Sequence, residues 1–296
     1  MSTFEYQGKR HINYFEGWYT RIIDLKQAVN LAVIFAVTYY EEDPHAFIQI
    51  FDQVNMKNTY LRYDVHSFKA DQDEIWIESN RLTLNHLKIV SDAIYIDVSM
   101  KNHNHLNKFS AMGFLEKLPL ECYQEVLYLD AHLEGIITIN GETKNLLGHS
   151  YMEKTYGKNF PKRWFWLQAN NVKDAFSFTL AGGSVPTLFF TKFGFFIIIK
   201  YHEKEYAFGT YNFAKLKVEK VGEHVYFTVK KGTYKITITA YLKNPVNLVG
   251  PSKGGNMNLD VLESIESTMT LQFYHHKNLL YEGEFSHAGF EWMYEK

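Results

Sequence analysis

Two glutamates of the 296-residue chain stand in segments that are rich in aromatic residues. Glu16 follows Phe15 and precedes Gly17-Trp18, and Glu153 lies three residues before Tyr156. A carboxyl group that is buried among apolar groups has a raised pKa, so it can hold a proton near neutral pH. Glu16 and Glu153 are therefore candidates for acid chemistry. A solvent-facing glutamate with no catalytic role is the alternative at each position.

Residues 164–170 have the composition of a strand that lines a ligand site. Successive side chains of a strand point to opposite faces, so one face carries Trp164, Trp166, Gln168 and Asn170. The other face carries Phe165, Leu167 and Ala169. Indoles and amides on one face suit a flat ring with polar substituents inside a cavity. An exposed face is the alternative, and strand parity does not decide between the two.

The remaining candidates are polar or aromatic residues in the same segments or near the end of the chain: Trp18, Tyr19, Gln49, Lys154, Tyr156, Glu282 and His287. Lys154 and Tyr156 share the face opposite Glu153 and could orient a phenol or pair with a carboxylate. A surface lysine beside a packed tyrosine is the alternative. Glu282, His287 and Glu291 recur near glycines, and a histidine–glutamate pair among them could move protons near neutral pH, or they could simply stabilise turns.

Several other kinds of chemistry lack the residues that they need. Cys122 is the only cysteine, which excludes an intrachain disulfide and a cysteine-rich zinc site. The sequence has no Gly-x-Ser-x-Gly motif and no glycine-rich phosphate loop. With 31 Lys and Arg against 33 Asp and Glu, the net charge of −2 argues against binding to nucleic acid. We therefore expect no metal, no cofactor and no nucleic-acid partner.

Alternating apolar and polar residues predict that the candidate side chains stand on β-strands. Residues 94–100 and 234–242 alternate with period two, which is typical of strands with one buried face. The 17% share of aromatic residues also favours strands. Four dipeptides that tolerate positive φ predict turns: Asn140-Gly141, Gly182-Gly183, Lys231-Gly232 and Gly254-Gly255. The helix that we expect is a short one, at residues 260–264.

The two halves of the chain resemble each other weakly. Residues 94–102 and 236–244 share their alternation and both close with Lys-Asn, at an offset of 142 residues. Trp18 aligns with Trp164 at an offset of 146, and Glu134-Gly135 aligns with Glu282-Gly283 at an offset of 148. These matches predict an all-β chain of two antiparallel barrel halves, residues 1–145 and residues 146–296. Chance similarity between two alternating sequences is the alternative.

Two segments carry a resemblance to a known family: residues 14–19, and residues 148–157 with their continuation through 160–170. Residues 46–50, 248–257, 263–264 and 282–291 add further matches. On these residues the chain resembles the tocopherol cyclase family over nearly its full length. The resemblance implies two lipocalin-like β-barrels and closure of a prenylated hydroquinone to a chromanol. Plant cyclases tend to carry Asn-Trp-Gly where this chain has Thr155-Tyr156-Gly157, which leaves the substrate open.

Such a ring closure protonates an alkene, and a phenol oxygen then captures the tertiary cation. The reaction needs an acid and aromatic faces near the cation. Glu16 or Glu153 would donate the proton, with Lys154 and Tyr156 beside the acid. A non-catalytic lipocalin-like protein that binds a hydrophobic small molecule is the alternative function. A carbohydrate-processing enzyme with paired carboxylates is a third.

Nothing in the sequence has the pattern of a signal peptide or a membrane span. The first residues lack a basic start followed by an apolar stretch. The most apolar segment, residues 188–199, contains Lys192 and is shorter than the roughly 20 residues that a spanning helix needs. We expect a cytoplasmic protein whose partner is a hydrophobic small molecule. Peripheral contact with a membrane and the oligomeric state stay open.

Overall fold

The computed structural model describes residues 3–8, 12–92, 94–186 and 191–294, and most of them lie in antiparallel β-strands. The helices of this described part are short 3-10 turns: η1 (Leu25–Gln27), η2 (Val65–Ser67), η3 (Gly113–Lys117) and η4 (Thr210–Asn212). The predicted all-β fold is confirmed. The short helix expected at residues 260–264 is wrong, because these residues belong to strand β20.

The chain forms two compact units, each with its own core. Unit 1 comprises Met1–Ser110, Glu121–Phe160 and Val249–Leu259, and unit 2 comprises Ala111–Leu120, Pro161–Leu248 and Asp260–Lys296. The units are discontinuous along the chain. The predicted continuous division into residues 1–145 and 146–296 stays a prediction.

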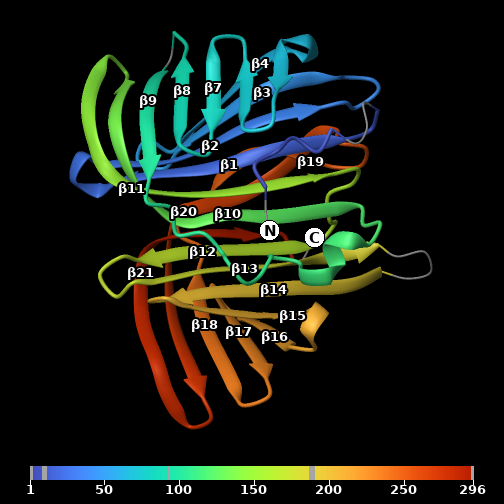
Figure 1. Cartoon of the computed structure of the whole chain (residues 1–296), viewed down its shortest axis with the longest axis vertical. Helices are drawn as coiled ribbons and strands as arrows, with labels where there is room; N and C mark the ends of the chain where they lie inside the picture. The colour runs from blue at the N-terminus through green and yellow to red at the C-terminus, as the bar shows by residue number, and fades with distance from the viewer. Residues whose placement is uncertain (1–2, 9–11, 93, 187–190, 295–296) are drawn as a thin grey trace. The chain divides into compact units, whose positions relative to one another are not determined.

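An eleven-stranded antiparallel sheet, ordered β4-β3-β2-β1-β11-β10-β9-β8-β7-β6-β5, curls into a nearly closed barrel in unit 1 (Figure 1). Its interior holds one apolar core that includes Trp18, Val33, Ile96 and Leu133. The strands are β1 (Phe15–Asp24), β2 (Val29–Thr38), β3 (His45–Asp52), β4 (Lys57–Asp64), β5 (Phe68–Ala70), β6 (Glu74–Ile77), β7 (Asn80–Thr83), β8 (His86–Val90), β9 (Ile94–Lys101), β10 (Cys122–Ile139) and β11 (Glu142–Gly157).

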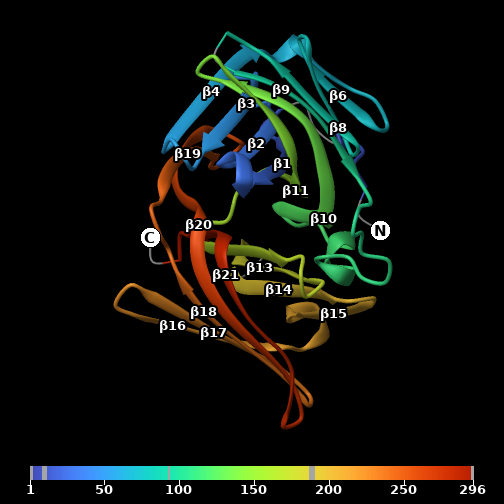
Figure 2. The same cartoon turned by 90° about the vertical axis from the view of Figure 1, so that its left-hand side faces the viewer.

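A ten-stranded antiparallel sheet forms the second barrel, and Figure 2 shows the curvature of its strands. Its order is β15-β14-β13-β12-β21-β20-β18-β17-β16, and β19 pairs with β20. The core includes Phe165, Leu180, Phe227 and Phe290. The strands are β12 (Trp164–Asn171), β13 (Phe176–Pro186), β14 (Thr191–Tyr201), β15 (Lys204–Gly209), β16 (Lys215–Val221), β17 (His224–Lys231), β18 (Tyr234–Tyr241), β19 (Val246–Pro251), β20 (Met257–His275) and β21 (Asn278–Trp292).

The order of strands in the two sheets confirms the duplication. In each sheet the first strand, β1 or β12, lies between the strand that follows it and the last strand, β11 or β21. Strands β9 and β18 occupy equivalent places, and each directs alternate apolar side chains into its core. Asn102 and Asn244, which follow these strands, both adopt the left-handed conformation, with φ of 54° and 46°. The offset of 142 residues therefore aligns equivalent strands.

Two of the predicted equivalences are wrong. The Trp18 side chain lies in the core of unit 1, whereas Trp164 lies on the face of β12 away from the core of unit 2. A shift of one residue reverses the face of every side chain in a strand, so the offset of 146 is incorrect by an odd number. Glu134 lies in β10, whereas Glu282 lies in β21, the counterpart of β11.

Three of the four predicted turns are present. Asn140-Gly141, Lys231-Gly232 and Gly254-Gly255 each separate two strands and contain residues with positive φ. Gly182-Gly183 instead lies inside β13. A Cβ on Gly182 would lie 2.6 Å from Cζ of Phe165, so this glycine allows an aromatic ring of the core to approach the backbone.

Candidate functional site

Both faces of strand β12 are buried over most of its length. Phe165, Leu167 and Ala169 point into the core of unit 2, as strand parity predicted. On the opposite face, Trp164, Trp166 and Gln168 are only 5%, 4% and 1% exposed, and Asn170 is half-buried. Nε2 of Gln168 donates a hydrogen bond of 2.8 Å to Oδ1 of Asn170. The alternative hypothesis, that this face is exposed to solvent, is therefore wrong for the two indoles and for Gln168.

Two glutamates lie on the same face of the sheet as these indoles. Glu291 in β21 stands directly across from Trp166, and Glu263 in β20 stands directly across from Glu291. Nε1 of Trp164 donates a 2.7 Å hydrogen bond to Oε2 of Glu291, and the carboxyl groups of Glu263 and Glu291 are hydrogen-bonded to each other. We call Glu263 and Glu291 the carboxyl pair.

A hydrogen bond between two carboxyl groups requires a proton on one of them, because an ionised carboxylate is only an acceptor. Burial raises the pKa of Glu291, and the hydrogen bonds with Trp164 and Glu263 lower it only in part. Two carboxyl groups in contact disfavour a second negative charge, so one of them keeps its proton to a higher pH than an isolated glutamate does. The carboxyl pair is therefore equipped to donate a proton.

The sequence prediction missed Glu263 as a site residue and named Glu291 only in passing. Both residues lie in segments that contributed to the family resemblance, residues 263–264 and 282–291. The hairpin of β20 and β21 brings the two glutamates, which are 28 positions apart in the sequence, directly across from each other.

A second group of charged residues lies inside the barrel of unit 1. Glu16 and Lys154 are completely buried, and Glu125 is 7% exposed. Nζ of Lys154 lies 3.5 Å from Oε1 of Glu16 and 3.7 Å from Oε1 of Glu125. The same nitrogen lies 5.8 Å and 5.0 Å from the ring centres of Trp18 and Tyr156. We call Glu16, Lys154 and Glu125 the interior charge cluster.

The predicted acid Glu16 accepts several hydrogen bonds in this cluster. The Tyr14 hydroxyl donates a 2.6 Å bond to Oε2, and the backbone N–H of Gln7 lies 3.0 Å from both oxygens. Burial raises the pKa of Glu16, while attraction to Lys154 and these hydrogen bonds lower it in part.

Residues 3–8, which we call the N-terminal strap, cover the interior charge cluster through their backbone. The N–H of Thr3 donates to Oε2 of Glu125 at 2.8 Å. The carbonyl oxygen of Glu5 accepts from Nζ of Lys154 at 2.6 Å, and that of Phe4 accepts from Nε1 of Trp18 at 3.0 Å. With the bond from Gln7 to Glu16, four backbone groups of the strap engage side chains of the barrel.

The other predicted acid, Glu153, lies on the opposite face of β11. It is 7% exposed, and its Oε2 accepts hydrogen bonds from the Tyr151 hydroxyl at 2.5 Å and from Nε2 of Gln124 at 2.9 Å. Tyr19 lies on this face too and contacts the Tyr151 ring edge-on. The structure therefore brings Glu16, Trp18, Lys154 and Tyr156 together inside the barrel and separates them from Glu153 and Tyr19.

Gln49 is buried on the face of β3 that points away from the barrel interior. Its Oε1 accepts a 3.1 Å hydrogen bond from the N–H of Val249, and its Nε2 has no partner within the described residues. An amide NH2 group without a partner offers two N–H donors, which suit an acceptor group of a ligand.

The structure keeps Glu282 and His287 apart from the carboxyl pair. Glu282 is exposed, and Nε2 of Gln272 donates to it at 2.5 Å. It lies nine positions before Glu291 along β21, which corresponds to roughly 30 Å of extended strand. His287 interacts with its neighbour Ser286, whose hydroxyl lies 3.0 Å from Nδ1.

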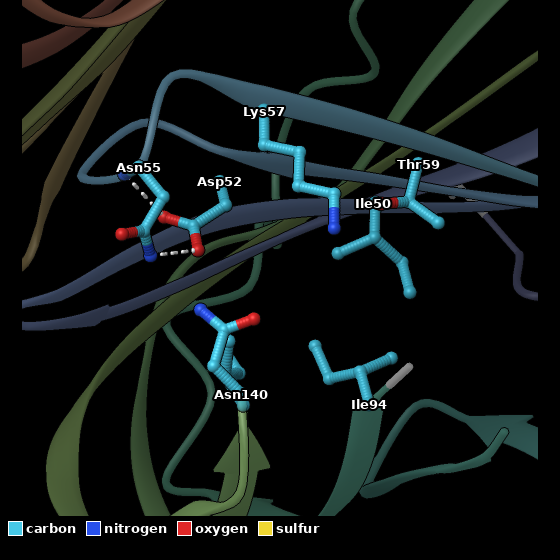
Figure 3. Close-up of a pocket in the computed structure, with 8 residues that line it drawn as sticks. Ile50, Asp52, Asn55, Lys57, Thr59, Ile94 and Asn140 are labelled. Carbon is cyan, nitrogen blue, oxygen red and sulfur yellow. Dashed lines mark hydrogen bonds between the residues drawn. The ribbon is translucent and has the colours of Figure 1, made fainter. Parts of the chain in front are cut away.

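A small pocket opens at one end of the unit 1 barrel (Figure 3). Its volume of about 30 Å³ holds about one water molecule, whereas ligand sites for organic molecules span roughly 300–1,000 Å³. Asp52 in its wall accepts hydrogen bonds from the N–H and Nδ2 of Asn55. The lining residues are Ile50, Asp52, Asn55, Lys57, Thr59, Ile94, Ile139 and Asn140.

Metal-binding clusters and membrane-spanning helices are both absent from the part of the chain that the structure describes. No group of three or more His, Cys, Asp and Glu side chains there has the arrangement of a metal site. No helix within residues 3–8, 12–92, 94–186 and 191–294 has the length and apolar character needed to cross a membrane.

Comparison with known proteins gives a family and a fold. The model of the tocopherol cyclase-like family matches residues 98–292. A crystal structure of a protein assigned as AttH from Nitrosomonas europaea superposes with a TM-score of 0.56 and 11% sequence identity, covering 95% of this chain and 92% of that one. Kievitone hydratase from Nectria haematococca superposes with a TM-score of 0.53 and 10% identity, covering 95% and 89%. No curated protein sequence matches significantly.

Proposed function

The chain belongs to the tocopherol cyclase-like family, and on this premise we propose that it catalyses the acid-dependent ring closure of a prenylated hydroquinone, or a related hydrophobic aromatic, to a chromanol. The proton donor is the carboxyl pair of unit 2. A carboxyl proton adds to the prenyl alkene and leaves a tertiary carbocation. A phenol oxygen bonds to that carbon, and its proton returns to the carboxylate. Substrate and product are isomers, so the reaction consumes no co-reactant.

The carboxyl pair is the observation that carries this proposal. Protonation of an alkene demands an acid that is still protonated at the working pH. The raised pKa of Glu291, beside Trp164 and across from Trp166, supports the carboxyl pair in this role. Indole faces attract a nearby cation through their quadrupole, which favours the carbocation.

The rest of the β12 face supplies contacts for the aromatic head of the substrate. Gln168 and Asn170 continue the row from the two indoles and already share a hydrogen bond. Their amides could accept from and donate to hydroquinone hydroxyl groups, which would hold the phenol oxygen near the cation.

Glu16 and Glu153 remain the predicted alternative proton donors. Glu16 has a raised pKa, but the Lys154 ammonium only 3.5 Å away would repel a carbocation. Glu153 lies where Tyr151 and Gln124 both donate to one of its oxygens. The geometry favours the carboxyl pair over both.

Incubation with prenylated hydroquinones in D2O tests the proposal directly. We expect a chromanol that carries one carbon-bound deuterium at the position that was protonated, detected by chromatography and mass spectrometry. Tails of one to four prenyl units should be compared. Absence of chromanol over the whole panel would overturn the cyclase proposal.

Binding measurements separate the cyclase from the alternative function. A non-catalytic lipocalin-like protein would bind the hydroquinones and return them unchanged. The variants Glu291→Gln, Glu263→Gln, Glu16→Gln and Glu153→Gln identify the donor. Turnover that survives Glu291→Gln but not Glu16→Gln would assign the acid to the interior charge cluster instead.

A further inference from the structure

The interior charge cluster of unit 1 is costly to bury and plays no part in the proposed ring closure. A buried ion pair can often be replaced by apolar residues without loss of stability, so three charged side chains inside a barrel call for another explanation. Lys154 and Glu16 are completely buried, and Glu125 nearly so. Their partners include backbone groups of the N-terminal strap.

The contacts of the strap have the chemistry of a secondary amide. Two N–H groups, of Thr3 and Gln7, donate to Glu125 and Glu16. Two carbonyl groups, of Phe4 and Glu5, accept from Trp18 and Lys154. All four groups belong to the backbone, so any molecule with amide groups at this spacing could make the same bonds.

The apolar part of the strap fills the space beside these groups. The Phe4 side chain is 7% exposed and belongs to the core of unit 1. The Tyr6 ring lies 5.2 Å from the Phe68 ring and 6.4 Å from the Trp18 ring. A ligand that replaced the strap would therefore need an apolar or aromatic body next to its amide.

We propose that the interior of the unit 1 barrel is a second ligand site, specific for hydrophobic secondary amides, and that the N-terminal strap occupies it as a tethered competitor. Lys154 binds the amide oxygen, and Glu16 accepts from the amide N–H. Because a tethered segment acts at a high effective concentration, a free ligand must be tight-binding or the strap must be weakened before it binds.

Calorimetric titration with N-phenethyl decanamide tests the site in the full chain. In the variant Phe4→Ala/Tyr6→Ala the strap loses its apolar contacts while its backbone is intact. We expect this variant to bind the probe at least ~10-fold more tightly than the natural sequence does. A synthetic peptide with the sequence of residues 3–8 should compete.

Substitution of the anchoring cation provides the control. Adding Lys154→Met to the weakened-strap variant should reduce probe affinity at least ~10-fold, because a buried amide oxygen then lacks its charged donor. The matched change Lys101→Met, at an exposed lysine of the same barrel that pairs with Glu134, should leave affinity unchanged. Equal affinity in the natural and weakened-strap sequences, or no effect of Lys154→Met, would overturn the proposal.

Hydrogen exchange in the unmodified protein tests the displacement of the strap without any variant, so the result does not depend on whether a variant folds. Saturating probe should displace the strap and accelerate exchange of the Thr3 and Gln7 amide protons, while exchange in β1 stays slow. Unchanged exchange with saturating probe would contradict the proposal. Glu291→Gln should not alter probe binding, so failure of the ring-closure proposal and failure of this one are distinguishable.

Discussion

At the scale of single residues, the Glu291 carboxyl group makes the strongest demand on the proposed chemistry. Replacement by Gln removes the transferable proton but keeps an oxygen that can accept from Trp164. We expect Glu291→Gln to lower kcat for chromanol formation about 100-fold or more, with substrate affinity changed only slightly. The exposed Glu282→Gln is the matched control in the same strand and should retain full turnover.

The raised pKa of Glu291 gives the reaction a predictable pH dependence. Only the protonated acid can donate, so kcat/KM should be high at acidic pH and fall as pH rises through the raised pKa of the carboxyl pair. Glu263→Gln removes the second negative charge that disfavours full ionisation, so the fall should move to lower pH. A kcat/KM that rises with pH where this fall is expected would exclude the pair as the donor.

The same shift links protonation to stability. Because the pKa of Glu291 is higher in the folded chain than in the unfolded chain, its stabilising effect is complete at low pH and is lost as pH rises through the folded value. Urea unfolding should show that Glu291→Gln reduces this loss at alkaline pH. An unchanged pH dependence of the unfolding free energy would argue that Glu291 is not buried in its acid form.

Lys154 should be essential to the stability of unit 1. Lys154→Met leaves Glu16 and Glu125 buried without their cation, which typically costs about 3–5 kcal/mol of unfolding free energy. Adding Glu16→Gln should restore part of that loss, because one buried charge is then removed. Urea titrations of the single and double variants measure the loss of unfolding free energy and its partial recovery. If Lys154→Met alone is as stable as the natural sequence, Lys154 is not essential to the stability of unit 1.

Strand parity predicted which residues share a face, but not which residues meet across strands. A period of two correctly predicts that Glu16 and Trp18 share a face and that Lys154 lies on the face opposite Glu153. It also predicts the two faces of β12. Glu263 meets Glu291 through a hairpin whose register shifts three times, between Ser264 and Ser267, between Ser267 and Met269, and between Phe273 and Tyr274. Bulges of this kind are not visible as a pattern of residue types, so the carboxyl pair was not predictable from the sequence.

At the scale of strands, Gly135 is a position in the barrel wall that has no room for a side chain. Its φ is 151°, and a Cβ there would lie 2.2 Å from the backbone oxygen of Asp97 in β9. We expect Gly135→Ala to lower the unfolding free energy by at least about 2 kcal/mol. Gly141→Ala is the control, because a Cβ at this turn meets nothing within 4 Å, and it should cost only about 1 kcal/mol.

The two errors at the level of elements have a common physical origin. Gly182-Gly183 was predicted to be a turn because glycine tolerates positive φ, but these glycines serve the close approach of Phe165 and Pro161 to β13. Residues 260–264 were expected to form a short helix, but they belong to β20 and lie just before its bulges. In both cases packing between neighbouring strands overrides the local preference of the segment.

At the scale of the whole molecule, the sequence was sufficient to predict an all-β chain with an internal duplication. The evidence came from residues whose role is the same in each half, such as Asn102 and Asn244, which both end a strand in the left-handed conformation. Trp18 and Trp164 misled because conspicuous residues need not be equivalent ones. The alternation that makes duplicated strands recognisable also makes a shift of one residue hard to detect.

The backbone character of the strap's contacts has a consequence for how this part of the chain evolves. Drift in the side chains of Thr3, Glu5 and Gln7 leaves the four hydrogen bonds of the strap intact, because none of those bonds uses a strap side chain. Insertion or deletion of one residue would instead exchange donors and acceptors along the segment. Selection should therefore preserve the number of residues between the strap and Glu16 more strictly than their identity, and a library of single-residue insertions at Gly8 should lose stability where substitutions do not.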